Sequence, residues 1–223
     1  MNKKILLVDD ASFMRMVCKD FLTKNGFEVV GEAGNGLECL EMYKSLKPDL
    51  VLLDIAMPEY DGKWALTKLM EHDPQAKIIM LSAVGHARAV VDCLKLGACD
   101  FIVKPFNDET VIAAINKAFE PGNEINPEVL EPISALSALS GENVLPQNII
   151  YMIIHTARTT DDPSSGAMET IAYALKSLAP GFQAQNISPS PFAADETPAL
   201  LRQLIQGQEK MVSLLNRLVE EKG

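Results

Sequence analysis

The sequence predicts a doubly wound α/β fold of the (βα)5 type, a five-stranded parallel sheet, followed by an all-α C-terminal region. Within residues 1–120, five short apolar runs alternate with five longer segments of helical periodicity. The short runs are continuously apolar, which is typical of parallel strands covered by helices on both faces. After Pro121-Gly122 no such run recurs with strand character, so the remaining chain is expected to be helical.

The elements of the first part can be assigned in order from this alternation. The expected strands are Ile5–Val8, Phe27–Val30, Leu50–Leu53, Ile78–Leu81 and Phe101–Val103. The segments with apolar residues three and four apart are Phe13–Leu22, Leu37–Leu46, Trp64–Met70, Val90–Leu96 and Val111–Phe119. Glycines at the ends of the first and fourth of these segments are typical of helix termini.

The second part divides into helices and a linker. One helix is expected from Asn126-Pro127 to Gly141, a second from Pro146 to Arg158, and a third from Ser164 to Pro180-Gly181. We therefore expect four parts: residues 1–120 as one domain, 121–181 as a helical region, 182–198 as a linker, and 199–222 as an amphipathic terminal helix with a short heptad pattern.

Composition excludes several classes of function. The net charge is -10, and residues 121–223 hold six basic and twelve acidic residues, which argues against binding nucleic acid. The four cysteines show no C-x-x-C spacing that would indicate a zinc site or a disulfide framework. The apolar run Ile5–Val8 is too short for a signal peptide or a membrane span, so we expect a cytoplasmic protein without membrane insertion.

Carboxylates follow two of the predicted strands. Asp9 and Asp10 come directly after the first apolar run, and Asp54 comes directly after the third. In an open α/β sheet, ligands bind beyond the carboxyl ends of the strands, so neighbouring strands would bring these groups together. Like charges at such closeness call for a cation, and hard oxygen ligands suit Mg²⁺. Taken alone, Asp10 is equally well explained as a helix N-cap.

Polar residues also follow the fourth and fifth predicted strands. Ser82 follows the fourth run and Lys104 follows the fifth. A hydroxyl and an ammonium beside a metal-bound carboxylate are the groups needed to hold phosphoryl oxygens. The coincidence of four strand ends indicates a phosphoryl site more strongly than any single residue.

The same residues carry a resemblance to a known family. The stretches concerned are Val8-Asp9-Asp10-Ala11-Ser12-Phe13-Met14-Arg15, Leu53-Asp54-Ile55-Ala56-Met57-Pro58 through Gly62, Leu81-Ser82-Ala83 and Phe101-Ile102-Val103-Lys104-Pro105-Phe106. Residues 1–120 resemble the receiver domains of two-component response regulators, and most of all the CheY-like receivers of chemotaxis. The resemblance implies a flavodoxin-like or CheY-like sheet with strand order 2-1-3-4-5.

The resemblance also implies roles for individual residues. Asp54 would be the phosphoacceptor, taking the phosphoryl group from the phosphohistidine of a histidine kinase. Mg²⁺ would be held by Asp9, Asp10, Asp54 and the backbone carbonyl of Ala56. Such a protein is a phosphoacceptor and not an enzyme, beyond its own phosphotransfer and slow autodephosphorylation.

A second set of residues is implied to sense the phosphate. Lys104 would bind the phosphoryl group, and the bond from Lys104 to Pro105 is expected to be cis. Ser82 would swing toward the phosphate and let Phe101 turn inward, which makes these two residues a switch.

The sequence departs from the family pattern at three positions. Chemotaxis receivers often carry tyrosine where this chain has Phe101, so a hydroxyl contact in the active state is absent here. Ala56 and Val84 are small or apolar and cannot readily orient a hydrolytic water. We therefore expect the phosphate to be lost more slowly than in receivers with polar residues there.

The output of residues 121–223 is left open by the sequence. His155 suggests a phosphotransfer domain, but its place on an apolar run favours a structural histidine. The terminal helix 199–222 indicates an interaction protein that contacts an unidentified target or a second copy of itself, although docking onto its own domain explains the helix equally well. The alternative is a transcriptional regulator with a C-terminal DNA-binding region.

Overall fold

The computed structural model describes residues 2–83, 85–122, 124–126, 129–130, 145 and 147–159, and in the last range the side chains of 149–158. All of these residues belong to the first of two compact units, Met1–Phe182. The expected helix 164–180, the linker 182–198 and the terminal helix 199–222 lie outside the described residues. Of the helix expected from Asn126 to Gly141, the structure describes Asn126, which is not helical, and Val129 and Leu130, which are.

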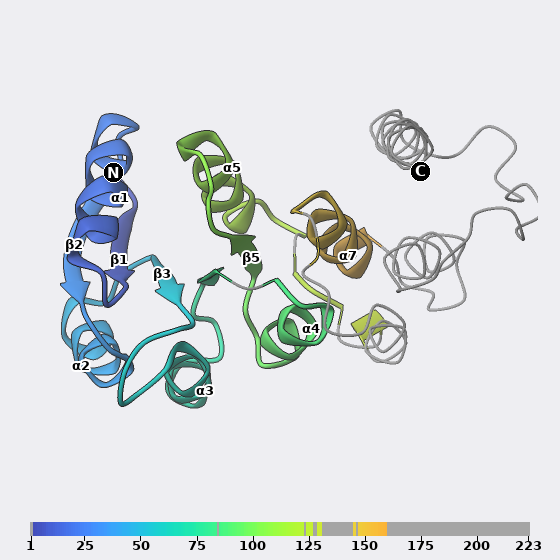
Figure 1. Ribbon diagram of the computed structural model, residues 1–223, viewed down its shortest axis with the longest axis horizontal. Helices are drawn as coiled ribbons and strands as arrows, with labels where there is room; N and C mark the ends of the chain where they lie inside the picture. The colour runs from blue at the N-terminus through green and yellow to red at the C-terminus, as the bar shows by residue number, and fades with distance from the viewer. Residues whose placement is uncertain are drawn as a thin grey trace, which may run out of the picture. The chain divides into compact units, whose positions relative to one another are not determined.

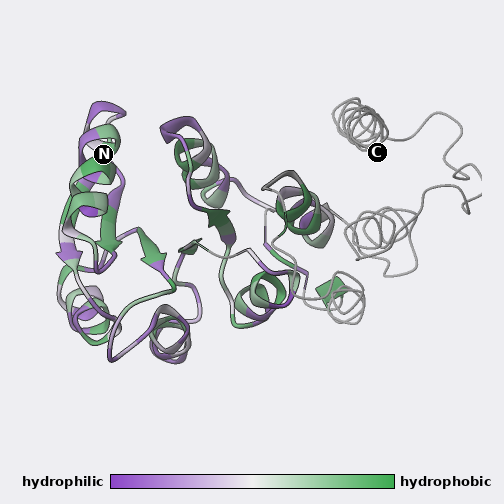
Figure 2. Cartoon of the chain, viewed as in Figure 1, coloured by the Kyte–Doolittle hydropathy of each residue, from purple (hydrophilic) through white to green (hydrophobic). Residues whose placement is uncertain are grey.

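A five-stranded parallel sheet forms the centre of the fold (Figure 1). Its strands are β1 (Lys4–Val8), β2 (Glu28–Ala33), β3 (Leu50–Asp54), β4 (Ile78–Ser82) and β5 (Asp100–Val103). The strand order is β2-β1-β3-β4-β5, and every pair is parallel. The predicted topology is therefore confirmed. Strands β1, β3 and β5 are green in Figure 2, as expected for strands covered on both faces.

Helices cover both faces of this sheet. They are α1 (Ser12–Lys24), α2 (Gly36–Leu46), α3 (Gly62–His72), α4 (Ala87–Lys95) and α5 (Asp108–Ala118). Helices α1 and α5 lie on one side, and α2, α3 and α4 lie on the other (Figure 1). A buried cluster between the sheet and the α1–α5 layer joins side chains from both helices to alternate strand residues. This layered arrangement leaves the carboxyl ends of the strands as the place for a site.

Side-chain caps mark where three of the helices begin. Asn35, Asp61 and Asn107 each accept a hydrogen bond from the backbone N–H three residues later, at the starts of α2, α3 and α5. Each bond satisfies one of the N–H groups that the first turn of a helix leaves without a helical partner. Short polar side chains before an apolar period thus set these boundaries.

Strand β2 is longer than the sequence predicts. The apolar run stops at Val30, but the strand continues through Gly31 and Glu32 to Ala33, with a shift in register against β1. A Cβ atom at Gly31 would lie 2.7 Å from Leu46 Cδ1, so helix α2 packs closely on the backbone there. A strand at the edge of the sheet is half-buried and needs no continuous apolar run. The apolar run therefore stops before the strand does.

One further helix follows the sheet. Helix α7 (Gln147–Thr159) agrees with the helix predicted from Pro146 to Arg158, and it packs against β5. In the part of the chain that the structure describes, no helix combines the length and the apolar character needed to cross a membrane.

Candidate functional site

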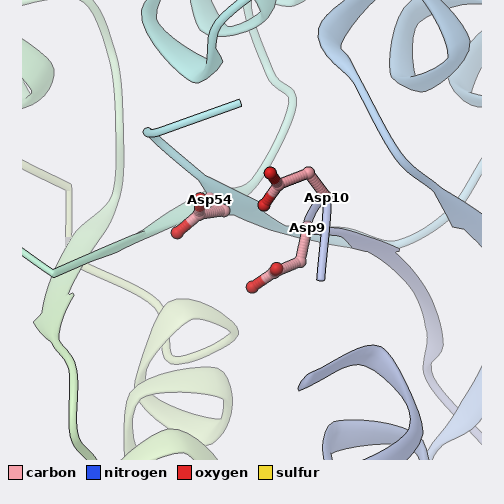
Figure 3. A group of neighbouring side chains, drawn as sticks. All are labelled: Asp9, Asp10 and Asp54. Atoms are coloured by element: carbon pink, nitrogen blue, oxygen red, sulfur yellow. The ribbon is translucent and has the colours of Figure 1, made fainter. Parts of the chain in front are cut away.

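Three carboxylates meet at the carboxyl end of the sheet. Asp9 follows β1 and Asp54 is the last residue of β3, and these two strands are paired neighbours. One ligand oxygen from each of Asp9, Asp10 and Asp54 lies within 4.8 Å of the others. Figure 3 shows the three side chains directed into one space. The sequence prediction that these groups converge is therefore confirmed.

Lys104 connects two of the carboxylates. Its Nζ lies 2.6 Å from Asp9 Oδ2 and 2.6 Å from Asp54 Oδ1. Asp9 and Asp54 are only 5% and 3% exposed, so these charge-assisted bonds are largely shielded from water. Lys104, directly after β5, thus places a cation beside the carboxylates at the ends of β1 and β3.

The surroundings change the proton affinities of these groups. Burial raises the pKa of Asp54, the ammonium of Lys104 works against this, and the charges of Asp9 and Asp10 add to the rise. Burial acts to lower the pKa of Lys104, but its bonds to Asp54 and Asp9 outweigh burial and raise this pKa. Lys104 therefore stays charged, and it helps Asp54 to ionise among other carboxylates.

The acidic group fits Mg²⁺. Among the described residues, three carboxylates share this space and the Lys104 ammonium pairs with two of them, so negative charge remains at a buried edge of the sheet. Carboxylate oxygens are the ligands that Mg²⁺ prefers, and the exposed Asp10 leaves one side open for water. A cation at this place would offset the mutual repulsion of Asp9, Asp10 and Asp54.

Ser82 and Phe101 occupy neighbouring strand ends. Ser82 is the last residue of β4 and 4% exposed, and its carbonyl accepts a 2.7 Å hydrogen bond from the Lys104 N–H. Phe101 in β5 is fully buried, so its ring already lies inside the protein. The peptide bond between Lys104 and Pro105 is cis, as the resemblance implied.

The loop after β3 packs tightly beneath Asp54. A Cβ atom at Gly62 would lie 2.1 Å from the Asp54 carbonyl oxygen, and the Gly62 N–H donates to the Ile55 carbonyl at 3.0 Å. This close approach fixes the backbone that carries the Asp54 carboxylate. Ala56 is exposed in the same loop, two residues after Asp54. Val84, which follows β4, lies outside the described residues.

Arg15 is a site residue to which sequence reasoning assigned no role. Its Nη1 donates to the Asp9 carbonyl oxygen at 2.6 Å, and its Nε lies 3.4 Å from Glu32 Oε2. Lys19 also binds Glu32, at 2.8 Å. Arg15 therefore links α1 and β2 to the backbone of the acidic group. The available signal was its position one helical turn after Ala11, on the helix that follows the two carboxylates.

The histidine of α7 and the cysteines are not part of the acidic group. His155 is half-buried on α7, with its ring centroid 6.0 Å from that of Tyr151, and burial lowers its pKa. All four cysteines are free. Burial raises the pKa of Cys18 to about 11 and that of Cys39 to about 12, so both thiols stay protonated at neutral pH.

Comparison with known proteins relates this arrangement to characterised relatives. Residues 5–116 match the response regulator receiver domain family. The chemotaxis protein CheY of Thermotoga maritima is 55% identical over 117 residues, which cover 52% of this chain and 98% of that protein. CheY of Bacillus subtilis is 56% identical over 117 residues, again 52% of this chain and 98% of the relative.

A solved structure gives the same relationship. The crystal structure of the CheX-CheY-BeF3-Mg²⁺ complex from Borrelia burgdorferi matches with a TM-score of 0.52 and 38% identity. The match covers 53% of this chain and 90% of that chain. The similarity in both comparisons thus spans about half of the sequence.

Proposed function

Since the chain belongs to the response regulator receiver domain family through residues 5–116, we propose that it accepts a phosphoryl group on Asp54 from a histidine kinase. As a receiver, the chain is a phosphoacceptor and not an enzyme with a separate substrate. In this proposal it acts in the cytoplasm and passes the signal on by protein–protein contact. The chemotaxis relatives support a chemotaxis-type pathway.

The bond between Lys104 and Asp54 carries this proposal. The 2.6 Å contact holds a charged lysine beside a carboxylate whose pKa burial raises. A carboxylate oxygen of Asp54 forms the new bond to phosphorus while the bond from phosphorus to the imidazole nitrogen of the donor breaks. The donor histidine leaves with that electron pair and takes up a proton. Lys104 then transfers its hydrogen bond to a phosphoryl oxygen.

The metal site supports the same reaction. Asp9, Asp10 and Asp54, with the carbonyl of Ala56, would hold Mg²⁺, which neutralises charge on the phosphoryl oxygens when bound. Asp9 accepts a hydrogen bond from the Ala11 N–H at 2.9 Å, so its carboxylate is oriented before a metal binds. Pre-orientation of this kind reduces the reorganisation needed during transfer.

Ser82 and Phe101 form the proposed switch. Ser82 stands at the end of β4 beside Lys104, where its hydroxyl can donate to a phosphoryl oxygen after transfer. Phe101 pairs with Met80 in the sheet, so movement at the end of β4 can reach this ring. The switch stays a proposal that the neighbouring strand positions support.

Intact-mass measurement after treatment with phosphoramidate and Mg²⁺ tests the assignment. We expect the mass of one phosphoryl group on the native chain and none on Asp54→Asn. Asp20→Asn is the matched control, because Asp20 is exposed and pairs only with Lys24 in the described structure. Phosphorylation of Asp54→Asn to the native level would overturn the assignment.

The output requires separate tests. Residues 182–222, which would carry self-association or contact with a target, lie outside the described residues. Light scattering with and without Mg²⁺ and beryllofluoride, on the full chain and on a chain ending at Gly181, tests self-association through 199–222. The alternative of a DNA-binding output is tested by gel retardation. Because residues 121–223 are acidic, we expect the chain not to retard DNA.

A further inference from the structure

Helix α7 covers the edge of the sheet along β5. Among the described strands, β5 is the last in the sheet order, and α7 lies beside it (Figure 1). Edge strands present unpaired backbone groups, and proteins often cover them with a helix. Figure 2 colours α7 largely green, and Ile150, Ile153 and Ala157 are fully buried. The helix is therefore a packed part of the receiver unit.

A buried ion pair anchors the C-terminal end of α7. Arg158, with a side chain only 2% exposed, lies 3.2 Å from Asp100 Oδ2 and donates a hydrogen bond to the carbonyl of Cys99. Asp100 is the first residue of β5. Breaking a buried pair leaves an uncompensated charge in the interior, which is strongly unfavourable. This contact fixes α7 to the start of the strand.

The other end of α7 reaches the loop after β4. The N–H of Leu145, just before the helix, donates to the Gly85 carbonyl at 2.7 Å. A Cβ atom at Gly85 would lie 2.5 Å from Val103 Cγ2 and 3.0 Å from Ile150 Cδ1. Gly85 is thus enclosed between β5 and α7 without room for displacement toward either.

Both of the segments that α7 holds lead directly into the acidic site. Gly85 comes three residues after Ser82, and Val103 comes directly before Lys104. The Lys104 N–H is bonded to the Ser82 carbonyl, so the ends of β4 and β5 move together. The docked helix consequently holds the backbone in the arrangement where Lys104 binds both Asp9 and Asp54.

We propose that docking of α7 on β5 and phosphorylation of Asp54 oppose each other, so that phosphorylation loosens α7. This inference rests on the proposed function. A phosphoryl group on Asp54 draws Lys104 and Ser82 toward its oxygens, which shifts the two strand ends. Because Gly85 is enclosed, the shift disturbs its contacts with Leu145 and Ile150. Linkage is reciprocal, so docking of α7 must weaken phosphoryl binding by the factor by which phosphorylation weakens docking, and loss of the α7 contacts strengthens phosphoryl binding by up to that factor.

Hydrogen exchange on the full chain measures the first direction. Backbone amides of residues 150–158 are compared with and without beryllofluoride and Mg²⁺, which together mimic the phosphoryl group. We expect exchange in this helix to become about tenfold faster, within the usual range of coupling between sites. Amides of α1, such as those of Phe21 and Leu22, serve as the internal control and should keep their rates.

Two outcomes would overturn the inference in different ways. Exchange in α7 that is unchanged or slower, while fluorescence of the single tryptophan Trp64 reports that beryllofluoride is bound, removes the coupling and leaves the proposed function intact. If beryllofluoride binds neither the native chain nor Asp54→Asn, the proposed function fails, and the coupling fails with it.

Variants of α7 measure the reverse direction. Arg158→Met removes the anchoring cation, and Ile150→Ala shortens the side chain that encloses Gly85 without leaving a charge buried. Each variant should bind beryllofluoride more tightly, by about tenfold for Arg158→Met and less for Ile150→Ala. Leu22→Ala, an equally buried truncation on α1, is the matched control and should leave the affinity unchanged. Native affinity in both folded α7 variants would contradict the coupling.

Discussion

The ammonium of Lys104 lies 2.6 Å from a carboxylate oxygen of Asp54, although fifty residues separate them in the chain. It is equally close to Asp9, so one cation compensates two of the three carboxylates. Lys104 and a bound Mg²⁺ therefore neutralise the same charges. Before phosphoryl transfer, Lys104 and Mg²⁺ therefore weaken each other's binding to these carboxylates. In the proposed function both cations are nevertheless needed for the transfer itself.

Replacing Lys104 by methionine separates these two effects. Lys104→Met leaves Asp9 and Asp54 without their cation, so we expect Mg²⁺ to bind about tenfold more tightly, a change of about 1.4 kcal/mol. Phosphorylation of the variant should nevertheless fall, because no ammonium receives the phosphoryl oxygens. Calorimetric titration with Mg²⁺ measures the affinity. Lys68→Met, which removes an exposed pair with Glu71, should bind Mg²⁺ like the native chain. Weaker Mg²⁺ binding by Lys104→Met would refute the competition.

Gly62→Ala should be one of the most damaging single-methyl changes in the fold. The added Cβ would lie 2.1 Å from the Asp54 carbonyl oxygen and 2.8 Å from the Ile55 Cα, and backbone atoms cannot move aside as the end of a flexible side chain can. We expect a loss of at least about 2 kcal/mol in the free energy of unfolding, measured with urea. Gly34→Ala is the matched control, because its Cβ would meet only side-chain ends at ordinary contact distance, Glu38 Oε2 at 3.6 Å and Arg15 Nη1 at 4.0 Å. Equal stability of the two variants would show that the loop after β3 can move to accommodate the added methyl group.

The acidic site could be predicted from the sequence because its residues follow apolar runs directly. Asp9, Asp54, Ser82 and Lys104 each stand at the carboxyl end of a strand, and parallel strands bring those ends to one edge. Strand order was the missing step, and it entered only through the resemblance. Bonds within the site, such as that from Lys104 to Asp9, then follow from the short reach between neighbouring strand ends.

The packing of α7 could not be predicted in the same way. The helix itself was predicted from the spacing of its apolar residues. Because it is buried on almost all sides, however, the sequence does not indicate which side packs against which element. Arg158 and Asp100 are 58 residues apart, and neither belongs to a recognisable motif. The role of Arg15 was missed for a related reason, because its acceptor is the backbone carbonyl of Asp9, which no sequence pattern marks.

Polar side chains near Asp54 should shorten the life of the phosphorylated state. Ala56 is exposed two residues after Asp54 and offers no group to orient a hydrolytic water. We expect Ala56→Asn combined with Val84→Glu to accelerate loss of the phosphoryl group by about tenfold, less than the roughly 100-fold or more that a fully positioned acid or base contributes. A dephosphorylation time course by intact mass measures the rate, with Glu59→Gln, a polar exchange in the same loop, as the control. An unchanged rate in the double variant would remove this explanation.

The bond from Tyr43 to Asp73 should make stability depend on pH in the acid range. The Tyr43 hydroxyl donates to Asp73 Oδ2 at 2.7 Å, and this bond, with a second from the Gln75 N–H, holds the pKa of Asp73 below its ordinary value of 3.8. The stabilisation is therefore present above about pH 4 and is lost as the pH falls through the lowered pKa.

Tyr43→Phe tests this pH dependence. The variant should be less stable than the native chain by at most about 1 kcal/mol near neutrality, because Asp73 is largely hydrated. The difference should shrink below pH 4, as measured by urea unfolding across the acid range. Tyr60→Phe, an exposed tyrosine that packs on Trp64, should show no such trend. A difference that stays constant with pH would assign the effect to packing instead.

The pair of Arg158 and Asp100 should produce a pH dependence of the opposite sign. Burial raises the pKa of Asp100, while the guanidinium of Arg158 works against the rise. A carboxyl with a raised pKa is most stabilising when neutral, so its contribution is present at low pH and lost as the pH rises through the folded pKa. In Arg158→Met the pKa of Asp100 rises further, because burial then acts without compensation. The deficit of this variant relative to the native chain should therefore grow toward neutral pH.

Asp100 has one pKa in the folded native chain and a higher one in folded Arg158→Met. Between these two values the deficit in the free energy of unfolding can grow by about 1.4 kcal/mol per pH unit, since each pKa unit corresponds to that free energy. Urea unfolding of both proteins between about pH 4 and pH 7 measures it. Lys24→Met, which breaks an exposed pair with Asp20, should show a small and pH-independent deficit, because water screens both charges. If the deficit of Arg158→Met were also constant, Arg158 would anchor α7 through its hydrogen bond to the Cys99 carbonyl and its packing, and the charge of Asp100 would contribute nothing.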